Sequence, residues 1–272
     1  MSPHVEDLLW AINSPALLRV QDDDDVPLLD PSQIDRDALA VFLRERPEHR
    51  VGHYFENLVH FWLKHIRGVE IVAHRQPVRD GERTLGELDF IFRDEAGLLH
   101  HWEIAVKFYL LTKPADGAPP RYLGPNTTDS LERKIARLHE HQLPLSQHVH
   151  PDIHQRHAFV KGRIYYHPSA TQEFAGLPDL NPAHLRGIWI HRSDLRAFLA
   201  DRSHHATACV RLPKPFWLTA AGDRIPLDEL VALTERHFAS ATNALHIALL
   251  DEHHNETQRL FVVSDKWPEL SL

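Results

Sequence analysis

Residues 85–110 constrain the fold most strongly, because they place three charged side chains inside strand-like apolar runs. The segment reads LGELDFIFRDEAGLLHHWEIAVKFYL, and the side chains of a β-strand alternate between two faces. Asp89 lies in the first run. Glu103 and Lys107 share one face of the second run, whose opposite face is wholly apolar. Because burying an unpaired charge costs free energy, such groups are usually paired or bound to a metal, and we look for chemistry here first.

The composition is that of an ordinary globular chain. Its 272 residues suffice for one large domain or two small ones, and the 43% hydrophobic fraction allows a sizeable core. The single cysteine, Cys209, excludes a disulfide framework and a thiolate zinc cluster and favours a reducing compartment. We expect a cytoplasmic protein without a membrane span, because no apolar run reaches about 18–20 residues and no basic region precedes the first apolar residues. The net charge of −8 argues against strong non-specific nucleic-acid binding but is compatible with a local basic groove.

The hydrophobic periodicity changes along the first half from helical to strand-like. Over residues 51–66 apolar side chains recur at three- and four-residue steps, which predicts the most regular helix, with Glu56 in its middle. Shorter helices are predicted at residues 5–18, with a break at Ser14-Pro15, and at 35–46, and an acidic loop at 21–33 separates them. The remaining predicted elements are strands at 69–78, 86–94 and 98–110, a loop at 111–127, a helix at 128–142 and a strand at 157–167. The order up to residue 167 is helix, three strands, helix and strand.

The second half contains shorter elements that extend the same sheet or pack on it. We expect a strand leading into a helix capped by Ser193, a strand at 211–219, a helix at 226–240 and strands at 244–252 and 259–265. The predicted fold class is therefore α/β, with a mixed central sheet flanked by helices. The simplest division is an N-terminal helical segment 1–50, a core 51–168 and a C-terminal extension 169–272, together forming one continuous domain.

The charged residues of the hairpin suit metal-dependent cleavage of a phosphodiester. Such chemistry needs carboxylates that hold Mg²⁺, which prefers oxygen ligands and lowers the pKa of a bound water. A lysine beside the metal orients the attacking water and offsets developing negative charge. Asp89, Glu103 and Lys107 meet these needs, and Glu56 on the preceding helix is placed to hold a metal-bound water.

These residues and the order of elements resemble the PD-(D/E)XK nuclease superfamily. The segments that carry the closer likeness are similar to the bacterial domain-of-unknown-function family 1853, and they read HYFENLVHFWL, GELDFIF, HWEIAVKFYL, LGPNTTDSLERKIARLHEHQL, VKGRIYYHP and RLFVVSDKWP. The resemblance implies a restriction-endonuclease-like core at residues 51–168 that binds Mg²⁺ or Mn²⁺ and hydrolyses nucleic acid. It implies that Asp89, Glu103 and the backbone carbonyl of Ile104 are metal ligands, that Glu56 supports the metal shell and that Lys107 assists the attacking water.

One position departs from the superfamily pattern. The usual lysine lies two residues after the glutamate, where this chain has Ala105, and Lys107 is displaced along the same strand face by roughly 7 Å. Lys134 on the following helix is a second candidate catalytic cation, and Gln142 near the end of that helix is placed to contact the same cleft. The departure and the net acidity favour an alternative, a catalytically inactive protein of this fold that binds nucleic acid or a protein partner.

Other interpretations use the same residues or the many histidines. Asp89 and Glu103 can form a salt-bridge network with Lys107 without any metal. Six histidines fall within nineteen residues and suggest zinc binding, although no HExxH signature accompanies them; they are His139, His141, His148, His150, His154 and His157. His191 and Asp194 beside Ser193 are reminiscent of a hydrolase triad, but the glycine pattern of a nucleophile elbow is missing.

Overall fold

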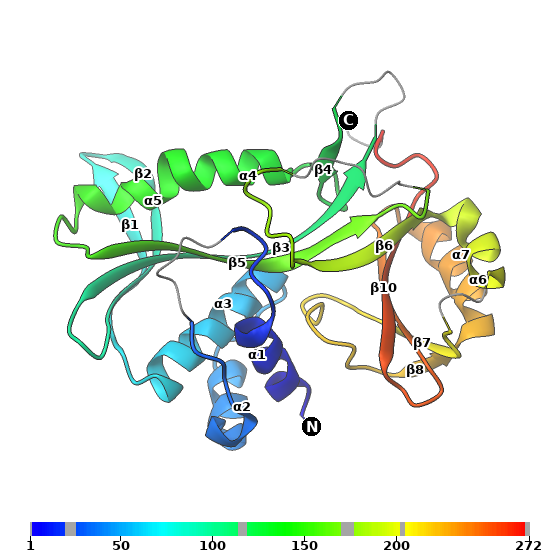
Figure 1. Ribbon diagram of the computed structural model, residues 1–272, viewed down its shortest axis with the longest axis horizontal. Coiled ribbons are helices and arrows are strands. Elements are labelled where there is room, and N and C mark those ends of the chain that lie inside the picture. Colours follow the sequence, from blue (N-terminus) through cyan, green and yellow to red (C-terminus); the bar gives the residue numbers. More distant parts are fainter. Residues whose placement is uncertain (1, 20–25, 114–118, 170–176, 202–204, 270–272) are drawn as a thin grey trace. The chain divides into compact units, whose positions relative to one another are not determined.

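The computed structural model describes residues 2–19, 26–113, 119–169, 177–201 and 205–269 (Figure 1). The chain forms two compact units, one of residues 1–107, 133–162 and 178–184, and one of residues 108–132, 163–177 and 185–272. We refer to them as unit 1 and unit 2. The predicted acidic loop falls partly outside the described residues, at positions 20–25. No helix among the described residues combines the length and apolar character needed to cross a membrane.

Among the described residues ten strands form one mixed sheet, which confirms the predicted α/β class. The strands are β1 (Glu70–Asp80), β2 (Arg83–Arg93), β3 (Leu99–Thr112), β4 (Arg121–Leu123), β5 (Gln155–Tyr166), β6 (Leu185–His191), β7 (Ala208–Arg211), β8 (Arg224–Pro226), β9 (Leu245–Leu250) and β10 (Glu256–Val263). Their order in the sheet is β1-β2-β3-β5-β6-β10-β9-β7-β8, and β4 pairs with β3. Strands β5, β6 and β10 run parallel to one another, whereas β1, β2 and β3 form antiparallel pairs.

The helices of the first half lie close to their predicted positions. They are α1 (Pro3–Asn13), α2 (Arg36–Arg44), α3 (Val51–Phe61), α4 (Leu131–Arg137) and α5 (Leu143–Leu145). A π-helical turn, Trp62–Ile66, continues α3, and another, Leu138–Gln142, joins α4 to α5. Asp35 caps α2, because its Oδ1 accepts hydrogen bonds from the backbone N–H groups of Asp37 and Ala38. The predicted order of helix, three strands, helix and strand is found from α3 to β5, with the short strand β4 added between β3 and α4.

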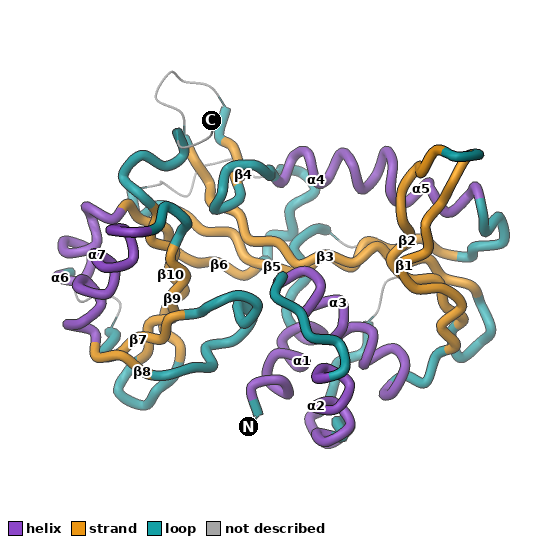
Figure 2. Tube along the Cα trace, turned by 180° about the vertical axis from the view of Figure 1, so that it is seen from behind, coloured by secondary structure: helices purple, strands orange, loops and turns teal. Residues whose placement is uncertain are grey.

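In unit 1, helices cover both faces of the sheet. Helices α1, α2 and α3 pack together on one face of β1, β2, β3 and β5, and the helical run that ends in α5 lies on the other face (Figures 1 and 2). The hairpin of β2 and β3 closes at residues 94–97, as predicted, and Gly97 adopts a positive φ of 80° there. This hairpin is therefore enclosed by helices, which accounts for the apolar character of both its strands.

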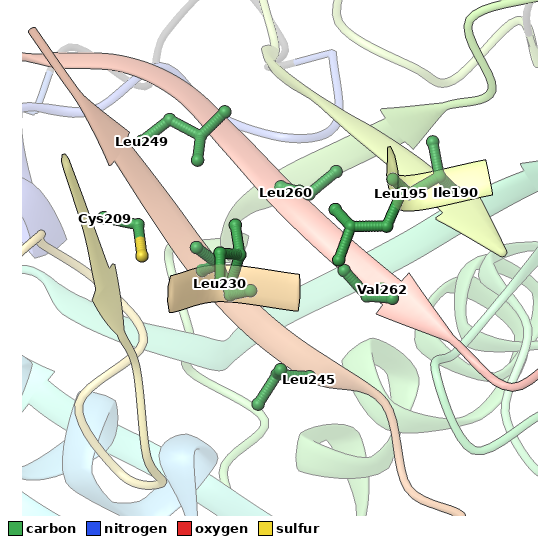
Figure 3. Packing of buried hydrophobic residues seen from close by; sticks show 9 residues of the cluster. Ile190, Leu195, Cys209, Leu230, Leu245, Leu249, Leu260 and Val262 are labelled. Atoms are coloured by element: carbon green, nitrogen blue, oxygen red, sulfur yellow. The ribbon is translucent and has the colours of Figure 1, made fainter. Parts of the chain in front are cut away.

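In unit 2, two helices cover the sheet formed by β6, β10, β9 and β7. They are α6 (Leu195–Ala200) and α7 (Leu230–Ser240), and Leu195 and Leu230 point from them into an apolar cluster with strand residues (Figure 3). Burying a side chain of this size contributes roughly 1.5–3 kcal/mol relative to leaving it in water. Strand β9 is buried along its whole length and β10 over its second half, which accounts for their near-continuous apolar runs.

Three sequence predictions need correction. The strand predicted at 211–219 does not form. Strand β7 ends at Arg211, because Pro213 and Pro215 cannot donate to a strand ladder. The loop predicted at 111–127 contains the short strand β4, which pairs with the end of β3. Ser193 does not cap the following helix with its side chain; instead its backbone N–H donates to Asp265 Oδ1 at 2.8 Å.

Candidate functional site

The predicted carboxylate pair lies where β2 and β3 stop pairing. Their ladder runs from Arg93↔Leu99 to Phe90↔Trp102, so Asp89 and Glu103 are the next residues on the two strands. Beyond the ladder, Ile104 donates its N–H to Asp89 Oδ2 at 2.7 Å, and the Asp89 N–H lies 3.5 Å from Glu103 Oε1. At the end of the ladder each carboxylate thus accepts a backbone N–H that a strand carbonyl would otherwise accept, and these bonds hold the two side chains together.

Glu103 is the most enclosed member of the site, with 1% of its surface exposed. His101, which lies on the same face of β3, places Nε2 2.9 Å from Glu103 Oε1. Gln142, at the end of the π-helical turn, donates to Glu103 Oε2 at 2.5 Å and accepts from Lys134 Nζ at 2.8 Å. A continuous chain of hydrogen bonds therefore runs from the helical lysine through Gln142 to the buried carboxylate.

The local electrostatics favour protonation of Asp89. Burial first and the negative charge of Glu103 second raise the pKa of Asp89 from its ordinary value of 3.8 to about 8. The Ile104 N–H and the charge of Lys134 oppose this rise. Burial and the nearby charge of Lys107 lower the pKa of Lys134, whereas Glu103 and Asp89 oppose this change. The site therefore combines two mutually repelling carboxylates with two cations in electrostatic reach.

Glu56 occupies a neighbouring ion pair. It is 9% exposed, and Arg75 donates to both of its oxygens, from Nε to Oε1 at 2.7 Å and from Nη2 to Oε2 at 2.9 Å. His74 Nε2 also lies 2.7 Å from Oε1. Burial alone would raise the pKa of Glu56, but the hydrogen bonds and charges of His74 and Arg75 outweigh it and lower the pKa to about 2. Glu56 is near enough to raise the pKa of Asp89, yet both of its oxygens are engaged by Arg75.

The backbone of Arg75 is unusual. It has φ of 52°, a conformation that non-glycine residues rarely adopt, and lies between the pairs His74↔Phe90 and Gln76↔Leu88, level with Asp89. This geometry turns the guanidinium toward Glu56. The sequence pattern did not indicate Arg75, His74 or His101, and the positive φ of Arg75 leaves no mark in the hydrophobic periodicity.

The remaining predicted residues have mixed placements. Lys107 is half-buried and follows Ala105 along β3, so no lysine stands at the position nearest the carboxylates on that strand. Ile104 contributes its N–H to Asp89. Within the described residues, no group of three His, Cys, Asp or Glu ligand atoms lying within 4.8 Å of one another includes Asp89 or Glu103. The side chains placed to act as metal ligands at this site are therefore the two carboxylates of Asp89 and Glu103.

The histidines between 139 and 157 do not gather into a metal site within the described part of the chain. His141 Nε2 lies 3.0 Å from the carbonyl of Leu85, and His150 Nε2 lies 2.9 Å from Gln76 Oε1. His154 contacts the ring of His100. These histidines make separate contacts with the β1–β2–β3 region, so the zinc alternative drawn from their density in the sequence gains no support.

Comparison with known proteins assigns the chain to a family. The family model described as Domain of unknown function (DUF1853) matches residues 6–263, and the chain belongs to this family. The match includes every residue of the carboxylate site and nearly all of both units. Searches of curated proteins and of solved structures each gave no significant match.

Proposed function

We propose that the protein is a Mg²⁺- or Mn²⁺-dependent phosphodiesterase acting on nucleic acid, with Asp89 and Glu103 as metal ligands. The observation that carries the proposal is the adjacency of these two carboxylates at the end of the β2–β3 ladder, in an environment that raises the pKa of Asp89 to about 8. Glu103 is buried and Asp89 is half-buried beside it, and two carboxylates held together with little access to water repel each other. A divalent cation would relieve that repulsion, whereas a purely structural pair gains nothing from it.

The donor set fits a hard divalent cation. Both side chains offer oxygen, and oxygen ligands suit Mg²⁺ and Mn²⁺ better than softer metals. The carbonyl of Ile104 remains the third ligand that the superfamily resemblance implies. A bound cation of this kind lowers the pKa of a coordinated water and polarises a phosphate oxygen.

The surrounding residues supply positioning and charge. Gln142 ties Lys134 to Glu103, so the ammonium group is held near the carboxylates and is suited to contact a phosphate oxygen. Lys107 adds a second positive charge in the same region. His101 and Gln142 together fix both oxygens of Glu103, which keeps this carboxylate oriented. Arg75 is held by Glu56 and stands level with Asp89 on the next strand.

A catalytically inactive nucleic-acid-binding protein is the second candidate, and two observations favour it. Arg75 donates to both oxygens of Glu56, so the negative charge of Glu56 is already matched by a guanidinium instead of facing a metal-bound water. Ala105 stands where the superfamily lysine would be, next to the carboxylates. Under this alternative the cations Lys107, Lys134 and Arg75 contact phosphates without cleavage.

A cleavage assay separates the two candidates. The purified full-length protein is incubated with single-stranded, duplex and branched DNA and with RNA, in Mg²⁺ or Mn²⁺. We expect cleavage that falls by at least about 100-fold in Glu103→Gln, because one metal ligand is lost. Glu87→Gln, an exposed carboxylate on the same strand as Asp89, is the matched control and keeps wild-type activity. Cleavage that survives Glu103→Gln contradicts the proposal, and substrate binding without cleavage supports the inactive binder.

A further inference from the structure

A second set of potential metal ligands lies in unit 2, remote in sequence from Asp89 and Glu103. His167 directly follows β5, His191 is the last residue of β6, and Asp194 ends the 3₁₀ turn Arg192–Asp194. Strands β5 and β6 run parallel, with Tyr166 paired to Ile188, so the two histidines emerge from the same end of the sheet. One ligand atom from each of the three residues lies within 4.8 Å of the others, and His191 Nδ1 is 3.8 Å from Asp194 Oδ2.

The ring of His191 is oriented as a metal ligand. Its Nε2 lies 3.1 Å from the backbone carbonyl of Trp267. Because a carbonyl oxygen only accepts hydrogen bonds, Nε2 carries the hydrogen, and the lone pair of the neutral ring is on Nδ1, the atom that faces Asp194. Metal-binding histidines are commonly held by such a bond from the other ring nitrogen to a carbonyl, which sets the tautomer and ring direction.

The second imidazole is also held in place. Ser169 engages His167 Nδ1 twice, with its Oγ at 2.7 Å and with its backbone N–H, which donates at 3.3 Å, so Nε2 is the ring nitrogen that remains for a metal. The Trp189 ring contacts both imidazoles, with centroid distances of 4.8 Å to His167 and 5.2 Å to His191. Trp189 is 6% exposed and donates its indole N–H to the carbonyl of Leu111 at 2.9 Å. A buried aromatic ring with its own anchor thus supports both histidines, so the two rings are set before any ligand binds.

We propose that His167, His191 and Asp194 form a binding site for a divalent transition metal of the Zn²⁺ type. Two imidazoles and one carboxylate suit Zn²⁺, whereas Mg²⁺ and Ca²⁺ prefer oxygen ligands alone. Neighbouring ligand atoms in a tetrahedral zinc site lie ~3.4 Å apart, so the observed group needs only a small contraction. Asp194 can supply it, because its side chain is 55% exposed while that of His191 is 28% exposed. Three protein ligands leave a fourth position open to water or a small anion.

The site is independent of the proposed nuclease activity, since none of its residues belongs to the carboxylate pair. Its rival explanation is an ordinary surface ion pair between His191 and Asp194, which are three residues apart. An exposed pair of that kind contributes ~0–1 kcal/mol to folding stability and does not require His167 nearby. Two observations favour a metal site over this pair. The Trp267 carbonyl fixes the ring of His191, and His167 places a third ligand atom beside those of His191 and Asp194.

Calorimetric titration of Zn²⁺ into the full-length protein tests the proposal. The chain has 23 histidines, so the matched control is His253→Ala, which removes an exposed histidine 3.6 Å from Glu252. We expect a tight Zn²⁺ site that weakens by at least about tenfold in His191→Ala and in Asp194→Asn and is unchanged in His253→Ala. Asp194→Asn alters an exposed side chain, so it keeps the test informative if His191→Ala folds poorly.

Visible absorption of the Co²⁺-loaded protein gives a second readout. Tetrahedral Co²⁺ has intense d–d absorption bands in the visible range. Co²⁺ bound non-specifically to surface histidines remains six-coordinate, and its bands are weak. We expect the strong bands in wild type and in His253→Ala and their loss in Asp194→Asn. Equal Zn²⁺ affinity and equal Co²⁺ spectra in wild type and Asp194→Asn overturn the proposal. Loss of the site in Asp89→Ala, with His191 intact, also overturns it.

Discussion

Asp89 and Glu103 lie side by side at the first residue beyond the β2–β3 ladder, where the Asp89 N–H is 3.5 Å from Glu103 Oε1. The Asp89 carboxylate in turn accepts the N–H of Ile104, the residue after Glu103. The end of a strand ladder therefore brings two carboxylates together and ties each to the other strand. Burial and mutual repulsion keep a proton on Asp89 near neutral pH, and a divalent cation would take the place of that proton.

Replacing Asp89 by asparagine should change how stability depends on pH. Between pH 3.8 and about 8 the folded protein retains a proton on Asp89 that the unfolded chain has lost, so wild-type stability falls as pH rises through this window. The asparagine side chain does not titrate and keeps an acceptor for the Ile104 N–H. We expect Asp89→Asn to gain on the order of 1–3 kcal/mol relative to wild type between pH 5 and pH 8.5, measured by urea unfolding without divalent metal.

The control for this comparison is Asp80→Asn, which alters an exposed carboxylate on β1. Its unfolding free energy should follow wild type at both pH values. Parallel pH profiles for wild type and Asp89→Asn would show that Asp89 titrates normally and that the carboxylates do not repel each other.

Glu56 should have the opposite pH signature. Its folded pKa of about 2 lies below its ordinary value of 4.5, so the stabilisation it provides is complete above pH 4.5 and is lost as pH falls toward 2. Breaking a buried ion pair costs about 3–5 kcal/mol, and because the Arg75 side chain is 34% exposed we expect about 2–3 kcal/mol for Glu56→Gln at pH 7. Thermal unfolding of wild type and Glu56→Gln at pH 7 and pH 3 checks this, and the difference should shrink at the lower pH.

Gln142 should couple Lys134 to Glu103. Removing its side chain leaves a buried carboxylate oxygen and a lysine without their shared partner, which costs about 1–3 kcal/mol. Gln147→Ala, which alters an exposed glutamine in the following turn, should be nearly neutral. In a double-mutant cycle, Gln142→Ala and Lys134→Met should show a coupling of about 0.5–3 kcal/mol. Additive effects would mean that the Lys134–Gln142 bond contributes nothing.

Gly162 should tolerate no side chain. It has φ of 152°, and a Cβ built there would lie 1.9 Å from the carbonyl oxygen of Lys107 on the adjacent strand. Gly162→Ala must therefore push β5 away from β3 beside the candidate site, at a cost of about 3 kcal/mol or more. Gly52→Ala is the matched control, because Gly52 lies in α3 with open space around it and alanine should stabilise a helix by about 0.5–1 kcal/mol. Chemical denaturation of both variants should give shifts of opposite sign.

The sequence predicted the hairpin, the preceding helix and the adjacency of Asp89 and Glu103, because period-two and period-3.6 patterns report which side chains share a face. Gln142 was also anticipated as a neighbour of the site, and the structure places it on Glu103. Arg75 could not be anticipated in the same way. Its contact with Glu56 depends on a local positive φ that interrupts the regular pleat, and periodicity carries no information about such an irregularity.

The proposed metal ligands His167, His191 and Asp194 in unit 2 could not be predicted as a group for a different reason. In the sequence His191 and Asp194 stand beside Ser193 in the pattern of a hydrolase triad, while His167 directly follows another strand, β5. Only the parallel pairing of β5 and β6 brings the three together, and strand order is not written in the local pattern. Conversely, the density of histidines between 139 and 157 was conspicuous in the sequence and corresponds to no cluster among the described residues.

Calorimetric titration of Mn²⁺ into wild type, Asp89→Ala and Glu87→Gln tests the carboxylate site most directly. We expect one Mn²⁺ site in wild type, its loss in Asp89→Ala and its retention in Glu87→Gln, with proton release on binding because Asp89 must ionise. Mn²⁺ binding of equal affinity in wild type and Asp89→Ala would contradict the assignment of Asp89 and Glu103 as a metal site.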